Sequence, residues 1–288
     1  MNYTFMYNIW MTGKVPPLLL KDKPVLTSIA GLCSYMGSGW GTEAVGIGLV
    51  AQQSNGQLIP ERLLWEAPNL KNANRAFQRA FNKAHRGYLP GKLFQNNPHL
   101  ETANFFVGYN DCVIADPSAS GNIVSGDFFV NNEKLTDLSY FFDFNRTLAG
   151  TLPAGLFRNL KNLETIARMF YRTDIRNAPD RLLAYNPKLR GLASAFNTCP
   201  RMKLSAGIFI DPASGITKAN RFAGVSPNFT SAFYGAGQQL GSSGGVAGTV
   251  PDLWNYTYGG DGPYGTSGCY APVNARFTNY SSIPAAWK

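Results

Sequence analysis

Apolar residues recur along this chain at fixed distances from a repeated proline. With each proline taken as position zero, positions three and four are apolar and position ten is leucine in every copy. The prolines are Pro16, Pro60, Pro90, Pro153 and Pro179, and the leucines at position ten are Leu26, Leu70, Leu100, Leu163 and Leu189. Position seventeen is phenylalanine at Phe77, Phe170 and Phe196, with Cys33 and Val107 as exceptions.

Two further copies of the pattern lack the proline. In one, Ser125 precedes Phe128, Phe129, Leu135, Leu138 and Phe142, and in the other Ser205 precedes Ile208, Phe209 and Phe222. The shortest interval between copies is 26 residues, from Pro153 to Pro179, and longer intervals are that unit plus an inserted loop. A repeat of 20 to 50 residues predicts a stacked array of structural units.

Each unit is expected to contain one short helix and one short strand. Proline suits the first position of a helix, the apolar pair at positions three and four forms its buried side, and Pro68, Pro98 and Pro187 end it. The following stretches, such as 26–29 and 163–166, are predicted to be short strands in a parallel stack. The predicted fold class is therefore an α/β repeat solenoid that forms one elongated domain.

Asparagine recurs beside these elements, and the expected role of these side chains is structural. An asparagine amide bonds to nearby backbone groups, which favours turns and stacked amide ladders. The residues concerned are Asn96, Asn97, Asn131, Asn132, Asn159, Asn186 and Asn197.

The repeat register divides the chain into three parts. Residues 1–14 are predicted to be the end of a preceding repeat or an N-terminal cap, and residues 15–234 the repeat array, with inserts at 34–58 and 108–124. Residues 235–288 are rich in glycine and tyrosine and are predicted to cap the array. An array needs such a cap because its last unit would otherwise expose an apolar face.

Residues 152–170 carry a resemblance to a known family. Proline, an aliphatic–aromatic pair, Asn-x-x-Leu and a final Met-Phe pair follow one another there, and the pattern resembles the BspA-type leucine-rich repeats. The similarity covers about residues 1–225. Such repeats occur in bacterial and protozoan surface proteins and in some phage structural proteins. The resemblance implies a right-handed leucine-rich-repeat solenoid used for adhesion or assembly, generally without catalysis, although the inserts and the glycine-rich end depart from regular members.

Composition and charge leave several partners open. The chain is 44% hydrophobic and only 15% charged, a weakly charged composition that is common outside cells, and its net charge is +9. A phosphate-tracking patch is one interpretation of Arg75, Arg79, Lys83, Arg86 and Lys92, with Phe77, Phe81 and Tyr88 interleaved. A solvated face is favoured because the register assigns Phe77 to the core, so no nucleic acid is expected, and an acidic glycan would satisfy the same charge.

The cysteines and the hydropathy of the chain bear on disulfide bonding, metal binding and membrane insertion. Cys33 occupies a core position, whereas Cys112, Cys199 and Cys269 leave a disulfide open, and none of the four has metal-site spacing. No run of about 18 apolar residues is present, so no membrane span is expected.

No catalytic or metal-binding motif is visible, and no cofactor is expected. His85 and His99 lie outside any such motif, and the glycines around Trp40 lack the spacing of a phosphate-binding loop. A glycan-active enzyme remains an alternative, since five carboxylates fall close together in the sequence, at Asp111, Asp116, Asp127, Asp137 and Asp143.

The candidate binding residues are large aromatic side chains outside the regular repeats. They bring a large contact area at low entropic cost, and they are Trp254, Tyr256, Tyr258, Tyr264 and Tyr270, with Trp40 from the first insert. A capping role, with Trp254 and Trp287 covering the last apolar face, is favoured over binding.

These observations favour a non-enzymatic structural or recognition protein of an extracellular assembly, such as a phage tail fibre or another virion component. The absence of a secretory signal at the start of the sequence favours the virion version. The alternative is the C-terminal part of a bacterial cell-surface adhesin with its signal lying upstream. Expected partners are other subunits of the assembly, or a glycan or protein on a host surface, and an oligomer is possible.

Overall fold

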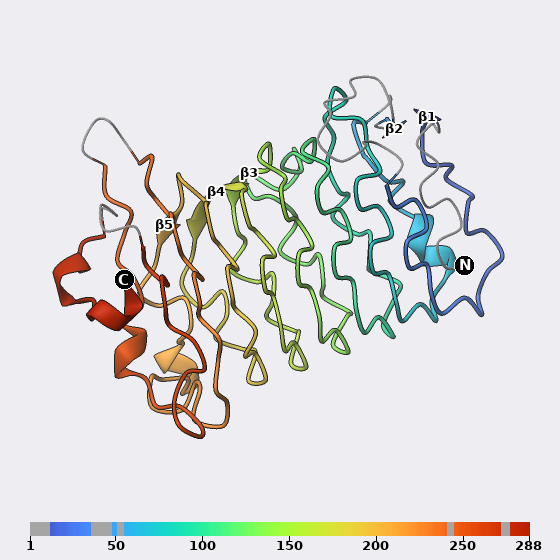
Figure 1. The fold of residues 1–288 in the computed structure, drawn as a ribbon. Helices are drawn as coiled ribbons and strands as arrows, with labels where there is room; N and C mark the ends of the chain where they lie inside the picture. The colour runs from blue at the N-terminus through green and yellow to red at the C-terminus, as the bar shows by residue number, and fades with distance from the viewer. Residues whose placement is uncertain (1–11, 36–47, 51–54, 241–244, 272–276) are drawn as a thin grey trace.

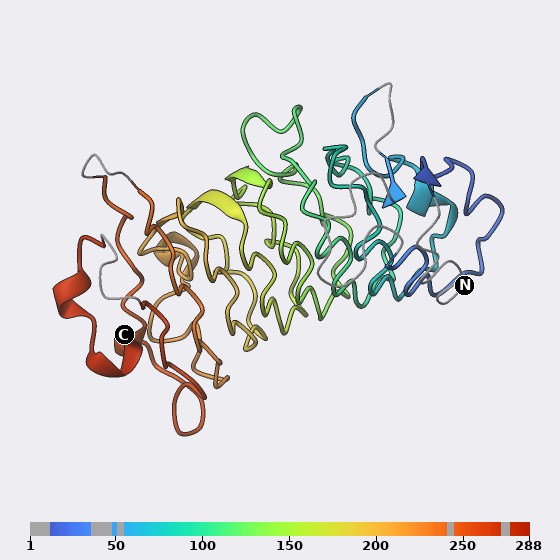
Figure 2. The ribbon, with the colours of Figure 1, turned by 45° about the horizontal axis from the view of Figure 1, so that its top comes forward.

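The chain winds through a row of similar coils that lie side by side (Figure 1). The computed structural model describes residues 12–35, 48–50, 55–240, 245–271 and 277–288. The N-terminal part lies at one end of the row and the C-terminal part at the other, and a view turned by 45° shows the same elongated arrangement (Figure 2).

One position of each coil pairs in parallel with the same position of the next coil. The bridges join Ser28, Asn72, Thr102, Asp137, Thr165, Gly191, Asn228 and Gly265 in that order. The first six of these residues stand at position twelve of the repeat, within the stretches predicted as strands. The predicted parallel stacking of these stretches is therefore confirmed, and neighbouring coils are about 4.8 Å apart at the bridges.

The strands of two residues or more lie elsewhere in the coil. β1 (Thr12–Gly13) pairs with β2 (Gly48–Leu49). β3 (Ala149–Thr151), β4 (Asp174–Ala178) and β5 (Lys203–Leu204) form a three-stranded sheet in that order, just before the first residues of three repeat copies, Pro153, Pro179 and Ser205. All these pairings are parallel, as expected for a chain that returns to the same side once per coil.

The helix predicted at the start of each unit is wrong for most units. The described residues contain no α-helix, and only after Pro60 does a regular unit start with a short helix, the 3₁₀ helix η1 (Leu63–Glu66). The other proline segments are hydrogen-bonded turns, in which the amide of Leu93 or Leu156 donates to the carbonyl of the proline three residues earlier. With proline at both ends, the segment is too short to nucleate a longer helix. The other 3₁₀ helices are η2 (Pro212–Ser214), η3 (Leu253–Asn255), η4 (Tyr280–Ser282) and η5 (Ala285–Trp287).

Backbone hydrogen bonds join the coils through positions thirteen to nineteen. In the second coil, the amides of Ala73, Arg75, Phe77 and Arg79 donate to carbonyls of the third coil over 2.8–3.0 Å. The residues at positions fifteen and nineteen have left-handed backbone, with φ between 52° and 68°. Because every fourth residue is left-handed, two successive side chains point into the core and the next two point toward solvent. This alternation explains why a hydrogen-bonded stack contains so few extended strands.

Position seventeen forms a column of stacked rings through the core. Phe142, Phe170, Phe196, Phe233 and Tyr270 follow one another with ring centroids 5.4–5.8 Å apart and near-parallel planes. Phe222 is therefore not the position-seventeen residue of its coil, because eleven residues are inserted between Ser205 and Asn228, with η2 among them, and Phe233 takes the place in the column.

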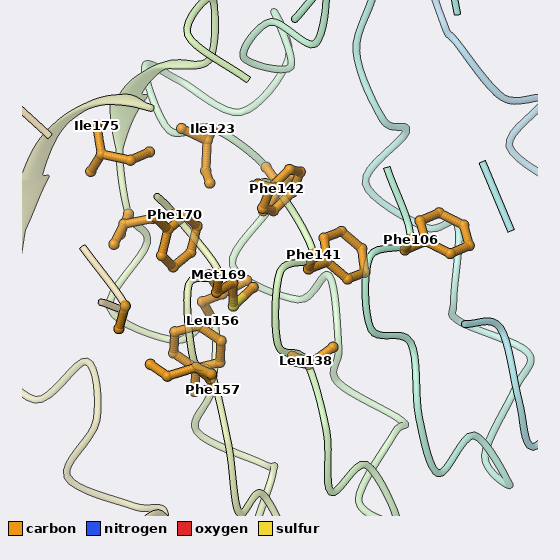
Figure 3. Packing of buried hydrophobic residues seen from close by; sticks show 14 of the residues in the cluster. Phe106, Ile123, Leu138, Phe141, Phe142, Leu156, Phe157, Met169, Phe170 and Ile175 are labelled. Atoms are coloured by element: carbon orange, nitrogen blue, oxygen red, sulfur yellow. The ribbon is translucent and has the colours of Figure 1, made fainter. Parts of the chain in front are cut away.

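The buried residues form one continuous cluster from Val15 to Trp287. Leu70, Leu100, Leu163 and Leu189 are buried and Leu26 is partly buried against the cluster, as the register predicts. Figure 3 shows residues of successive coils packing together, among them Phe106, Phe141 and Phe157.

All four cysteines are buried, and the structure holds them as free thiols. Burial raises the pKa of Cys33, Cys112 and Cys199 to about 12 and raises the pKa of Cys269 as well. Protonated thiols in this setting act as small apolar groups, which agrees with the core role predicted for Cys33.

Asparagine amides tie coils to the preceding ones, as predicted, except that the side-chain amide of Asn197 donates to the Ser194 hydroxyl of its own coil. The side-chain amide of the buried Asn97 donates to the carbonyls of Leu64 and Ala67, and that of the buried Asn132 donates to the carbonyls of Phe94 and Asn97. Asn186 repeats the arrangement two coils later. Asn96, Asn131 and Asn159 each donate to a carbonyl of the preceding coil from the exposed side.

The two inserts and the C-terminal region complete the row. Insert 108–124 pairs with its neighbours through Val113 and Asn122, so it extends the stack rather than leaving it. Most of insert 34–58, including Trp40, lies outside the described residues. At the other end, the buried Trp287 packs against Phe229 and Tyr270 and accepts a hydrogen bond from the Tyr270 amide at its carbonyl. Trp287 thus lies where the predicted cap is needed.

We expect Phe196→Ala to lower the free energy of unfolding by about 3–5 kcal/mol, because it leaves a cavity between two stacked rings. Tyr264→Ala, at a side chain that is 82% exposed, serves as the control and should change stability by less than about 0.5 kcal/mol. Urea unfolding followed by circular dichroism measures both. Equal losses in the two variants would contradict the ring column as a source of stability.

Candidate recognition face

Two columns of outward-facing side chains run along the coils at the left-handed positions. Position fifteen is occupied by Arg75, Phe105, Tyr140 and Arg168, and position nineteen by Arg79, Tyr109, Phe144 and Arg172. We call these eight residues, together with Tyr171, the arginine–aromatic face. Both columns read arginine, ring, ring, arginine over four successive coils.

The backbone fixes these side chains in place. A left-handed conformation costs a bulky residue about 1 kcal/mol, so it persists only where its surroundings impose it. Here the amides of Arg75, Phe105, Tyr140 and Arg168 donate to carbonyls of the next coil over 2.8–3.0 Å. The inter-coil hydrogen bonds thus impose the conformation that turns the side chains outward.

The column at position fifteen is a continuous stack. The guanidinium carbon of Arg75 lies 5.1 Å from the ring centroid of Phe105, and the rings of Phe105 and Tyr140 are 4.1 Å apart at 10°. Arg168 lies 5.2 Å from the ring of Tyr140. Each guanidinium therefore ends a pair of stacked rings through a cation–π contact.

The column at position nineteen repeats this geometry. Arg79 lies 4.8 Å from the ring of Tyr109, the rings of Tyr109 and Phe144 are 4.8 Å apart, and Arg172 lies 4.8 Å from Phe144. Tyr171 connects the columns, with Arg168 at 4.0 Å and Arg172 at 5.4 Å from its ring.

One acidic group lies beneath the face. The buried carboxylate of Asp143 pairs with Arg168, with 3.1 Å between Oδ2 and the guanidinium nitrogen. Burial raises the pKa of Asp143 to about 7, while Arg168 and a hydrogen bond from Tyr109 oppose the rise. The charge of this face therefore changes near neutral pH.

A cavity of about 350 Å³ adjoins the column at position nineteen. Three arginines line it, namely Arg146, Arg172 and Arg201, together with Thr173, Asp174, Thr198, Pro200 and Gln239. Arg201 pairs with the buried Asp174, and Arg146 pairs with Asp111. Among the described residues, Arg172 has no acidic partner, and its guanidinium instead contacts the rings of Phe144 and Tyr171.

The aromatic residues of the C-terminal region that were predicted to bind a ligand differ in their burial. Tyr270 is a fully buried member of the ring column, and its hydroxyl donates to the carbonyl of Pro251. Tyr256 is 6% exposed, so Tyr256 and Tyr270 are core residues rather than surface contacts.

The remaining predicted binding residues that the structure describes differ in their exposure. Trp254 and Tyr258 are partly buried against the core, and the hydroxyl of Tyr258 donates to the carbonyl of Leu253. Tyr264 is exposed, and Trp40 lies outside the described residues.

The carboxylates considered for catalysis have structural partners. Asp116 accepts hydrogen bonds from the amide and hydroxyl of Ser118, and Asp137 accepts them from the amide of Ser139 and the side chain of Asn104. Asp111 and Asp143 are ion-paired, and Asp127 is exposed.

Neither histidine belongs to a metal site in the structure. His85 is exposed and His99 lies 3.0 Å from the ammonium group of Lys134. Within the described ranges there is no group of three or more histidine, cysteine or acidic residues placed to hold a metal ion. No helix among them is long and apolar enough to cross a membrane.

The basic segment from Arg75 to Lys92 is not an aromatic platform. Phe77 and Phe81 are buried, so they cannot stack on a ligand, as the register predicts for Phe77. Arg75 and Arg79 instead belong to the arginine–aromatic face, whereas Lys83, Arg86 and Lys92 are exposed elsewhere. The face itself was not predicted from the sequence. Its signal was present there, because large polar or aromatic residues fill positions fifteen and nineteen of four successive units.

Comparisons with known proteins add little. No protein-family model matches the chain, and no curated protein matches it. Among solved structures, the chain is similar to one from the Toll–Spatzle complex, a molecular hub in Drosophila development and innate immunity. The identity is 15%, and the match covers 78% of this chain and 34% of that chain, with a TM-score of 0.22. Overlap at this level carries no argument about fold or function.

We expect Ser231→Gly to raise the free energy of unfolding by about 1 kcal/mol, because Ser231 has φ of 53° and glycine adopts that conformation without strain. Glycine already occupies the same position at Gly31 and Gly268. Ser231→Ala is the matched control and should give no gain, since alanine keeps the strain. Thermal unfolding compares the two, and equal stability of both variants would contradict the assignment.

We expect Asp143→Asn to remove a pH dependence of stability. The pKa of Asp143 is raised to about 7 in the fold, so its contribution is fully present below about pH 4 and is lost as the pH rises to 7. The wild type should therefore lose stability across that window relative to the variant. The loss should be on the order of 1.4 kcal/mol for every tenfold difference in proton affinity between the folded and unfolded chain.

Urea unfolding at pH 4, 5.5, 7 and 8 measures this difference. Arg168→Gln is the companion variant, and it should extend the loss to higher pH because it removes the opposing cation. Parallel curves for the wild type and Asp143→Asn would contradict the prediction.

Proposed function

We propose that the chain is a non-enzymatic solenoid of leucine-rich-repeat type that serves recognition in an extracellular assembly. The repeated apolar register, the parallel bridges from coil to coil and the continuous core support a stacked scaffold. A stack of this kind suits recognition because each coil presents its outer side chains at a fixed step from the last.

The observation that carries this proposal is the arginine–aromatic face. Its nine side chains come from four coils, and backbone hydrogen bonds and ring contacts hold them before any ligand arrives. Binding to such a surface loses little side-chain entropy. Arginine and tyrosine are also the residue types that contribute most strongly at interfaces.

The hydrogen bonds and ion pairs of the carboxylates support a role without catalysis. Asp111, Asp116, Asp137 and Asp143 each bind a neighbouring side chain, and Asp143 is fully buried. A glycosidase needs two carboxyl groups on either side of a substrate bond. Asp111, Asp137 and Asp143 link neighbouring coils, and Asp116 accepts hydrogen bonds from Ser118 within its own turn.

Two settings fit this scaffold, and we place the virion first. In a phage tail fibre or another virion component, the partners would be other subunits and a glycan or protein of the host surface. In a bacterial surface adhesin, the same face would meet a neighbouring cell. Both settings require the chain to be accessible from outside a particle or a cell.

Mass spectrometry of purified particles and of a surface-shaved cell fraction tests the location. We expect peptides of this chain in one of the two fractions at a level far above that in the cytosol. Enrichment in particles selects the virion version, and enrichment on cells selects the adhesin. Recovery from the cytosol alone would contradict the proposal.

A further inference from the structure

We propose that the arginine–aromatic face binds an acidic polysaccharide in which charged sugars are separated by neutral ones, with one acidic group entering the arginine-lined cavity. This inference rests on the proposed recognition function and names its ligand. It follows from the spacing of the arginines, from the state of their guanidinium groups and from the position of the cavity.

The cations of the face come in two pairs. Arg75 and Arg79 belong to one coil, and Arg168 and Arg172 belong to the coil three steps further along. At about 4.8 Å per step the pairs are about 14 Å apart. The interval is filled by the four rings of Phe105, Tyr109, Tyr140 and Phe144. The face therefore consists of two positively charged ends separated by an uncharged aromatic stretch.

The guanidinium groups are oriented before binding. Arg75 and Arg172 each lie within about 5 Å of a ring centroid, and among the described residues neither has an acidic partner. A guanidinium that stacks on a ring keeps its in-plane N–H groups free to donate. These groups match the paired oxygens of a carboxylate, sulfate or phosphate.

The rings themselves are already occupied on their faces. Phe105 stacks on Tyr140 at 4.1 Å and Tyr109 on Phe144 at 4.8 Å, and arginines cover the outer ends of both pairs. A nucleobase binds such platforms by stacking on an open ring face. A base would therefore have to separate rings that already stack on each other, whereas an acid group needs only the arginine edges.

Charge spacing also favours a polysaccharide over a nucleic acid. Duplex DNA carries a phosphate about every 3.4 Å along each strand, and proteins that follow it need a continuous line of cations. Here about 14 Å of uncharged rings separate the pairs. A polymer whose acid groups are widely spaced meets both pairs without leaving unpaired charge over the rings.

The cavity provides an end point for one acid group. It continues the column at position nineteen, because Arg172 lines it and Thr198 occupies that position in the next coil. Of the three arginines on its walls, Arg201 pairs with Asp174 and Arg146 pairs with Asp111, so the acid group would be received by Arg172, which has no acidic partner among the described residues. The polar groups there include the Thr198 hydroxyl and the Gln239 amide, which are suited to sugar hydroxyls.

Direct binding measurements test the proposal. Fluorescein-labelled hyaluronan, in which charged and neutral sugars alternate, supplies spaced carboxylates, polygalacturonate and dextran sulfate supply contiguous carboxylates and sulfates, unlabelled dextran competes as the neutral polymer, and poly(dT) supplies a single-stranded nucleic acid. We expect at least one acidic polysaccharide to bind tenfold or more tightly than dextran and poly(dT), with affinity falling as salt is raised. The acid type bound most tightly identifies the ligand chemistry.

Variants with matched charge locate the site. The quadruple change Arg75→Gln, Arg79→Gln, Arg168→Gln and Arg172→Gln should weaken binding at least tenfold. The control removes four cations outside the face, by Lys23→Gln, Arg86→Gln, Lys92→Gln and Lys203→Gln, and should change affinity less than threefold. The quadruple arginine-to-lysine variant keeps the charge but loses the forked donors, and it should fall between the two. Circular dichroism confirms that each protein is folded.

Three outcomes would overturn the inference: binding of dextran as tight as that of the acidic polymers, tighter binding of poly(dT), or equal losses in the face and control variants. If the glutamine variant does not fold, the lysine variant and the single change Arg172→Gln decide the question. If no acidic polymer binds but the chain is found on particles or cells, only the proposed ligand is contradicted. If an acidic polymer binds but the chain is found in the cytosol alone, the proposed extracellular setting is contradicted instead.

Discussion

The structure depends on one constraint: the backbone amides of one coil must find their acceptors in the next. The backbone amides at positions thirteen, fifteen, seventeen and nineteen donate to carbonyls of the next coil. The amides at positions sixteen and eighteen donate to carbonyls three residues earlier and so form turns within the coil. Left-handed residues at positions fifteen and nineteen make both possible. Backbone groups buried beside an apolar core need partners, so this pattern has to recur in every coil.

This constraint determines the outer surface as well as the core. Because the chain alternates two residues inside with two outside, position seventeen enters the ring column while positions fifteen and nineteen face solvent. The same side of each coil returns at every step. Side chains such as Phe105 and Tyr140 therefore meet their equivalents and stack, and a repeat that forms the core also forms the arginine–aromatic face.

Polar groups inside the row follow the same logic. Asn97, Asn132 and Asn186 are buried, and each side-chain amide donates to two carbonyls of the preceding coil, which also accept a backbone hydrogen bond within their own turn. Asp143 is different, because its carboxylate is buried with a single arginine partner, and burial raises its pKa to about 7. The asparagines hold the stack together at any pH, whereas Asp143 links the face to proton concentration.

The sequence by itself determined the repeat, the buried leucines, the amide ladders and the parallel stacking, because burial and hydrogen bonding act on every copy in the same register. It could not show that turns replace the predicted helices, or that Phe233 rather than Phe222 occupies the ring column. Both depend on the hydrogen-bond and packing partners that the neighbouring coil supplies. It also placed Tyr256 and Tyr270 at the surface, where composition alone suggested them. Only the tertiary structure brought Arg75, Arg79, Arg168 and Arg172 into one face, because residues nearly a hundred positions apart become neighbours only when coils stack.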